Sequence, residues 1–86
     1  MYTIGMDKKA IAILENWDPF NEGKKAYAHE IADVVLELHN LDDPTDLAKR
    51  IRAIYEHSHE LWIPIENCVQ VSYKLLAVKY EAKRIV

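Results

Sequence analysis

A pair of histidine and glutamate residues near the middle of the chain has spacing that could do chemistry. Glu56 and His59 form a Glu-x-x-His pair, the spacing that carboxylate-bridged di-iron bundles use to hold metal. Such a centre needs a second pair and two further inward glutamates, and the sequence contains no second Glu-x-x-His. His57 and His59 diverge by about 200° on a helix and cannot share one ion. We therefore predict no metal site, and an exposed, solvated helix face at these residues.

Catalytic and cofactor motifs are equally sparse. The two glycines, Gly5 and Gly23, lie too far apart to form a phosphate-binding loop. No serine, histidine and acid are spaced as a catalytic set. The single cysteine, Cys68, has apolar neighbours on its helix, which predicts a buried, unreactive thiol. We predict no catalytic residue and no cofactor, and we expect a protein that is not an enzyme.

Three acidic residues form the candidate interaction surface. Glu30, Asp33 and Glu37 recur at positions i, i+3 and i+7 beside the apolar stripe of a predicted helix. This row could receive a basic partner protein through electrostatic complementarity. An ordinary solvated helix face has the same pattern, so the row alone does not decide between the two interpretations.

Composition narrows the class of protein. The chain has 86 residues, of which 50% are hydrophobic and 29% charged, and we expect one folded domain over residues 1–86. The net charge of −3 argues against nucleic acid, because a binder needs a stripe of lysine and arginine. No apolar run approaches the roughly 20 residues that cross a bilayer, so no membrane partner is predicted. The lone cysteine and the absence of a signal-peptide pattern favour a cytoplasmic protein.

Three prolines divide the chain into four segments: Pro19, Pro44 and Pro64. Proline suits the first position of a helix, and Asp43 before Pro44 is a good N-cap. Apolar residues at helical spacing predict helices over about 6–16, 24–40, 44–61 and from 64 to near the end, with a loop or a short helical turn at 18–23. Short connections make consecutive helices antiparallel neighbours. The predicted fold class is all-α, a small four-helix bundle.

Two of these helices have more apolar surface than one core contact needs. Ala28, Ala32 and Leu36 widen the stripe of the helix over 24–40, which predicts that it is covered on two sides. The last helix has apolar residues on two flanks, so either it is central or a second copy covers part of it. A homodimer is therefore one prediction. At the helix ends we expect three aromatic residues to plug the core: Trp17, Phe20 and Trp62.

Short strings run in a fixed order through nearly the whole chain from the first helix onward: Trp17-Asp18-Pro19-Phe20, Gly23-Lys24-Lys25 with Tyr27, Glu30-Ile31 with Asp33-Val34-Val35, Leu47-Ala48-Lys49 with Ile51, Ile54-Tyr55-Glu56, Ile63-Pro64 with Glu66 and Cys68, and Lys74-Leu75-Leu76 with Lys79. Together they resemble the YugE-like family, small cytosolic proteins of Bacillus and its relatives that are classed as a domain of unknown function. The resemblance implies a compact helical domain without an established activity. It therefore transfers no functional residues to this chain.

Two kinds of function fit these observations. The favoured hypothesis is a non-catalytic helical module that binds a protein partner, because two helices carry surplus apolar surface and no catalytic set is assembled. The alternative is a small-ligand or metal-binding helical protein built around Asp18, Tyr27, Glu30 and the histidines. A pocket in which several of these residues converge would be its signature.

Overall fold

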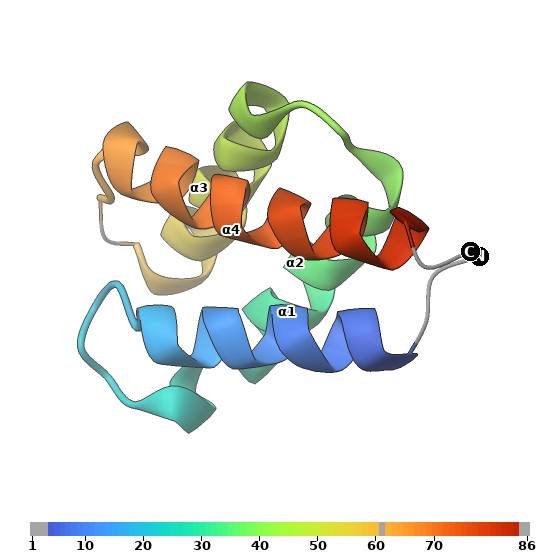
Figure 1. Cartoon of the computed structure of the whole chain (residues 1–86). Helices are drawn as coiled ribbons and strands as arrows, with labels where there is room; N and C mark the ends of the chain where they lie inside the picture. The colour runs from blue at the N-terminus through green and yellow to red at the C-terminus, as the bar shows by residue number, and fades with distance from the viewer. Residues whose placement is uncertain (1–3, 61, 85–86) are drawn as a thin grey trace.

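The described part of the chain, residues 4–60 and 62–84 of a computed structural model, forms four α-helices and one short 3₁₀ turn (Figure 1). In chain order the elements are α1 (Ile4–Trp17), η1 (Lys24–Tyr27), α2 (Ala28–Asn40), α3 (Pro44–His59) and α4 (Ile65–Arg84). The predicted all-α bundle with short loops is confirmed. In this part of the chain, no helix combines the length and the apolar character that crossing a bilayer requires.

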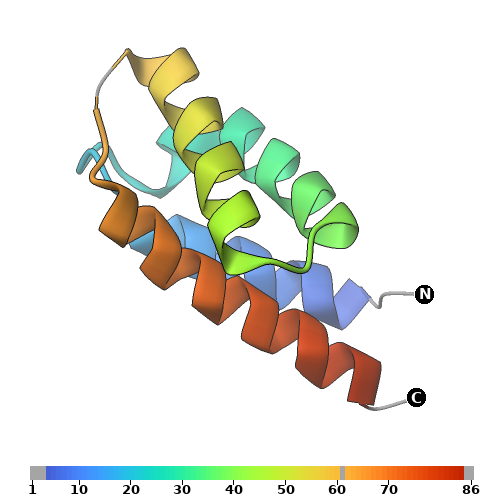
Figure 2. The same cartoon turned by 90° about the horizontal axis from the view of Figure 1, so that it is seen from above.

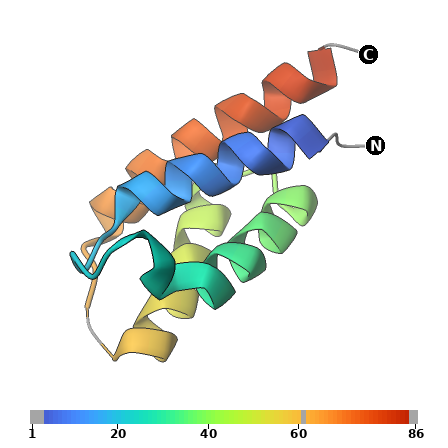
Figure 3. The same ribbon diagram turned by 90° about the horizontal axis from the view of Figure 1, so that it is seen from below.

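The helices form two layers of two. α1 and α4 lie side by side and run in opposite directions, and α2 and α3 form the second layer (Figures 1 and 3). Figure 2 shows that each helix also runs against its predecessor in the chain. The bundle is therefore a closed ring, in which α1 contacts both α2 and α4. This arrangement places the α1–α2 connection and the end of α3 close together.

The boundaries of α3 follow from its capping residues. The Asp43 carboxylate accepts a hydrogen bond from the Asp46 N–H at 3.2 Å, and Pro44 occupies the first turn, as predicted. The helix ends at His59 because Glu60 adopts a left-handed conformation, with φ of 56°. The predicted end at Leu61 lies outside the described residues. α4 then begins at Ile65, and the Pro64 carbonyl accepts from the Asn67 N–H at 3.0 Å.

The helix predicted over 24–40 is in two parts. Residues 24–27 form a tight 3₁₀ turn, and the α-helix starts at Ala28. Gly23 before the turn has φ of 96°, a conformation that glycine adopts without strain. Tyr27 at the junction departs from helical dihedrals, with φ of −116° and ψ of 22°. The hydrogen bonds of its side chain, described below, account for this break.

One cluster of buried apolar side chains joins the four helices. Trp17 and Phe20 pack against its edge, as predicted, whereas Trp62 is 72% exposed, so its predicted role as a core plug is wrong. Cys68 is buried, as predicted. The cluster consists of Met6, Ala10, Leu14, Tyr27, Ile31, Val34, Leu38, Leu47, Ala48, Ile51, Tyr55, Ile63, Cys68, Val71, Leu75 and Leu76.

A buried lysine on α4 terminates α2. The Lys79 side chain is 1% exposed, and its ammonium donates hydrogen bonds to the carbonyls of Leu38 at 2.6 Å and Leu41 at 2.8 Å. It also lies 2.9 Å from the Asp42 carboxylate. The last carbonyls of a helix have no partner inside the helix, and they carry its negative dipole end. The Lys79 ammonium supplies both a hydrogen-bond donor for these carbonyls and a positive charge at the negative end of the dipole, and it links α4 to the end of α2.

Replacing this lysine should therefore cost stability. We expect Lys79→Met to lower the free energy of unfolding by about 2–4 kcal/mol, because the two carbonyls lose a charged donor inside the core. Urea denaturation followed by circular dichroism measures the change. Lys74→Met, at an exposed position on the same helix, is the matched control and should change the urea midpoint little. Equal stability of the two variants would contradict this assignment.

The buried thiol gives a second prediction. Burial raises the pKa of Cys68 to about 11, so at mildly alkaline pH the folded protein holds it protonated and shielded. We expect no reaction with Ellman's reagent under native conditions and one equivalent after unfolding in denaturant. Labelling within seconds in native buffer would show that α4 is not packed as described.

Candidate functional site

An open groove between α1 and α2 is the largest hollow described on the molecule. It has a volume of about 650 Å³. Five of its lining residues are apolar and three are charged: Ile11, Ala28, Ile31, Ala32 and Val35, with Asp7, Glu15 and Lys25. Its size is that of a typical ligand pocket, but it is an open trough along two helices rather than an enclosed cavity.

Small side chains on α2 create this groove. Ala28 and Ala32 lie one turn apart on the exposed side of the helix, and neither is long enough to reach across to α1. Ile11 on the opposite wall is 36% exposed, and Leu36, one turn beyond Ala32, is 63% exposed. The prediction that this helix is covered on two sides is therefore wrong for the single chain. One apolar side packs into the core, and the other remains open.

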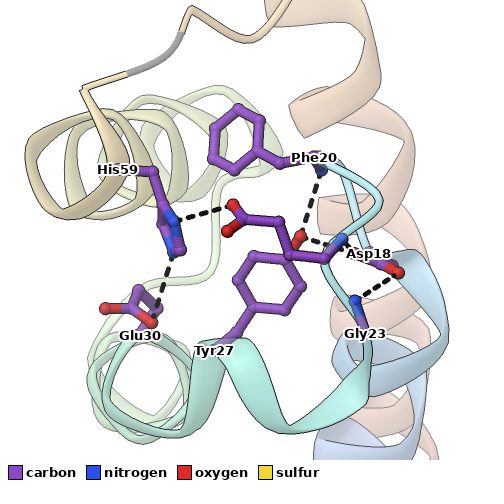
Figure 4. A network of polar contacts seen from close by, with 7 residues as sticks. Asp18, Phe20, Gly23, Tyr27, Glu30 and His59 are labelled. Carbon is purple, nitrogen blue, oxygen red and sulfur yellow. Dashed lines mark hydrogen bonds and ion pairs between the residues drawn. The ribbon is translucent and has the colours of Figure 1, made fainter.

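The connection between α1 and α2 is built around one carboxylate (Figure 4). Asp18 accepts hydrogen bonds from the backbone N–H groups of Glu22 at 2.8 Å and Gly23 at 3.0 Å. The Tyr27 hydroxyl donates to the same carboxylate at 2.5 Å and accepts from the Phe20 N–H at 3.1 Å. Asp18 itself has φ of 37°, an uncommon backbone conformation that these bonds hold in place. We call these contacts the Asp18 network.

The network changes the acidity of both side chains. The hydrogen bond from Tyr27, followed by those from the backbone N–H groups, lowers the pKa of Asp18 below its ordinary value. Burial and the bond to Asp18 raise the pKa of Tyr27. At neutral pH the carboxylate is therefore ionised and the phenol protonated, which is the combination that the observed bond requires.

His59 joins the end of α3 to this connection and to α2. Its Nδ1 lies 3.0 Å from Glu22 Oε2, and its Nε2 lies 3.7 Å from Glu30 Oε1 (Figure 4). The ring centroid is 5.1 Å from those of both Phe20 and Tyr27. Its side chain is only 14% exposed, so the predicted solvated face is wrong at this residue, although His57 is exposed. The ring therefore lies between two acids, with the tilted rings of Phe20 and Tyr27 beside it.

A second polar contact closes the other end of the groove. His39 in the last turn of α2 lies 2.8 Å from Asp7 in the first turn of α1, measured from Nε2 to Oδ1. The Asp18 network thus connects α1 and α2 at one end, and His39 with Asp7 connects them at the other. The separation of α1 and α2 is therefore fixed by polar contacts at both ends of the groove.

The predicted acidic row does not form one exposed surface. Glu30 is 8% exposed and faces His59, and Glu37 lies 3.4 Å from Arg50. Asp33 is exposed, in a separate hollow between α2 and α3 that Arg50 and His57 also line. None of the three acids lines the α1–α2 groove. The role of Glu30, Asp33 and Glu37 as an interaction surface stays a prediction.

The two residues of the Glu-x-x-His pair, Glu56 and His59, contact different parts of the molecule. The Glu56 carboxylate accepts from the Ile63 N–H at 2.8 Å, whereas His59 faces Glu22 and Glu30. Among the residues that the structure describes, no three histidine, cysteine or acidic side chains are placed to hold a metal ion. Asp18, Tyr27, Glu30 and His59 do come together. Asp18 and Tyr27 bond to each other and to backbone N–H groups, whereas the buried His59 Nε2 lies 3.7 Å from Glu30 Oε1, too far for a hydrogen bond.

Similarity to other proteins agrees with the fold. A family model described as "Domain of unknown function (DUF1871)" matches residues 9–85. The chain belongs to this family. It is 40% identical over 72 residues to "Uncharacterized protein YugE" of Bacillus subtilis (strain 168), covering 84% of each protein. A crystal structure of a protein from Bacillus stearothermophilus matches 93% of this chain and 99% of its own, with a TM-score of 0.89 and 32% identity. The resemblance to the YugE-like family is thereby confirmed.

Several strings that indicated the family have structural roles. Asp18, Gly23 and Tyr27 build the α1–α2 connection, and Glu56 accepts a hydrogen bond from the start of the α4 connection. Apart from Lys25, Ile31 and Val35, the groove is lined by residues outside those strings. Sequence reasoning missed the groove as a site. The signal that could have found it is the second apolar side at Ala28, Ala32 and Leu36.

The Asp18 network predicts a specific loss of stability in acid. Because the folded state depresses this pKa below its ordinary 3.8, the stabilising contribution is complete above that value and is lost as pH falls through the folded pKa. We expect Asp18→Asn to lower the urea midpoint at neutral pH. The gap to the wild type should narrow below about pH 4.

Asp33→Asn, at an exposed position on α2, is the matched control for this measurement. It should leave the neutral-pH urea midpoint nearly unchanged. A gap between Asp18→Asn and wild type that stays constant from neutral to acid pH would show that the Asp18 charge does not stabilise the connection.

Proposed function

We propose that this protein is a non-catalytic protein–protein interaction module whose binding surface is the α1–α2 groove. The observation that carries the proposal is the second apolar side of α2, which the chain leaves open along a groove of about 650 Å³. Contiguous exposed apolar surface is unfavourable in water and marks a contact site in many soluble proteins.

The shape of the surface supports a protein partner. The groove runs between two antiparallel helices, and the apolar surface of α2 continues beyond it to Leu36, which is 63% exposed. An amphipathic helix lays a stripe of apolar side chains into such a trough. Alanine at positions 28 and 32 would allow its backbone to approach closely. A compact small ligand would fill part of the volume and leave Leu36 in water.

The remaining features are compatible with this role. Near His59, Glu22 lies 3.0 Å from Nδ1 and Tyr27 is hydrogen-bonded to Asp18. Among the described residues, no metal-binding cluster adds a chemical function. The net charge of −3 favours a protein over nucleic acid as the partner. The single buried cysteine suits the reducing conditions of the cytoplasm, where we propose that the protein acts.

The predicted homodimer has its own candidate surface. Tyr73 and Tyr80 on α4 are 61% and 47% exposed, and they border a hollow of about 310 Å³ with Pro44, Leu76 and Ala77. This hollow is smaller than the α1–α2 groove and lies on other elements. The homodimer stays a prediction.

Blocking the groove tests the proposal. Ala32→Arg places a long charged side chain in the groove lining, and we expect it to abolish specific partner capture without unfolding the protein. The measurement is affinity purification from the native cell followed by mass spectrometry, with circular dichroism as the check on folding. Ala53→Arg, at an exposed alanine on α3 outside the groove, is the matched control.

The comparison between variants decides the result. A partner that is retained by wild type and Ala53→Arg but lost from Ala32→Arg supports the groove as the binding surface. Partners that are retained equally by all three proteins would refute it.

A further inference from the structure

We propose that the occupant of the groove is an amphipathic partner helix whose apolar stripe is bordered by two basic residues about two turns apart. This inference rests on the proposed function and adds the chemistry of the partner. Its basis is the distribution of charge along the α1 wall of the groove.

The α1 wall presents two acids with an apolar residue between them. Asp7, Ile11 and Glu15 are spaced four residues apart, so they form one row along the helix, and all three line the groove. At 1.5 Å per residue, the two acids are about 12 Å apart along the axis. Ile11 between them is 36% exposed. The row therefore reads acid, apolar, acid.

On the opposite wall, none of the described lining residues is acidic. On α2 the lining residues are all apolar, and Lys25 in the preceding turn is the one cation that lines the described groove. Asp7 already has one oxygen 2.8 Å from His39 Nε2, so its carboxylate is oriented by a neighbour. Positive charge on the edge of a partner helix that faces α1 would meet both acids, whereas charge on the other edge would meet Lys25.

A complementary helix follows from this pattern. Its apolar stripe would contact Ile11, Ala28 and Ala32, and lysine or arginine at positions i and i+7 or i+8 would face Glu15 and Asp7. Residues at this separation lie about two turns apart, which matches the separation of the two acids. Each half-exposed ion pair contributes only modestly to the binding free energy. The apolar contact would therefore supply most of the affinity, and the ion pairs would determine which helices are preferred.

Three synthetic helical peptides of 18 residues test the charge pattern. The first has a leucine stripe with two lysines, seven residues apart, along one edge. The second has the same composition with both lysines on the face opposite the stripe, and the third replaces the two lysines of the first with glutamates. Titration into isotope-labelled protein, followed by NMR, gives affinity and location together. We expect the first peptide to bind about five- to tenfold tighter than the other two at low salt.

Variants then assign the contact to residues. Glu15→Gln should remove most of the preference for the first peptide, and Asp33→Asn, which removes an exposed acid outside the groove, should leave it unchanged. The shifted signals should include Ile11, Ala28 and Ala32. A preference that Asp33→Asn abolishes instead would assign recognition to the acidic row and overturn the inference.

The other outcomes separate this inference from the proposed function. Equal affinity for all three peptides at the groove would overturn the charge pattern and leave the groove as a helix-binding surface. Binding of none of them would overturn the inference, while partner capture by Ala53→Arg but not Ala32→Arg would still support the proposed function. A wild-type dimer that Ala32→Arg converts to a monomer in sedimentation would assign the groove to a second copy, which also overturns the inference.

Discussion

The hydrogen bonds that converge on the Asp18 carboxylate are the constraint on which the α1–α2 groove depends. Two backbone N–H groups and one phenol point to a single side chain, and this fixes how the chain leaves α1 and enters α2. With the direction of α2 set there, its apolar stripe meets α1, α3 and α4 on one side only. Without that connection, the pair of His39 and Asp7 would be the remaining described polar contact that links α1 and α2 along the groove.

α2 has two apolar sides, but only one of them packs into the core of the bundle. Burial of Ile31, Val34 and Leu38 accounts for the side of α2 that holds the bundle together. The other side, at Ala32 and Leu36, contributes nothing to the described core. Stability alone would be served as well by polar residues there. The proposed interaction role explains why a chain with abundant charge leaves this strip apolar.

Local rules predicted the fold well, and they failed where partners are distant in sequence. The start of α3 was predictable because Asp43 and Pro44 act on neighbouring backbone groups. The burial of Lys79 could not be predicted in this way. The carbonyls that make it favourable belong to Leu38 and Leu41, which precede Lys79 by 41 and 38 positions. Likewise Glu30 and His59 look like surface residues on separate helical wheels, and only the closed bundle brings them together. The groove was half predicted: its apolar excess is in the sequence, but whether a neighbouring helix covers it depends on packing.

The lysine at the end of α2 has a mechanical consequence. Lys79 secures the last turn of this helix to α4, and His59 lies against its first turn from α3, so the rod is braced at both extremities. Sliding or tilting would break a charged contact inside the core. Because α2 is held at both ends, the groove surface loses little conformational entropy when a partner binds. Most of the entropy cost of ordering is then borne by the partner segment. A peptide that is disordered when free and folds into a helix on binding would suit this rigid surface.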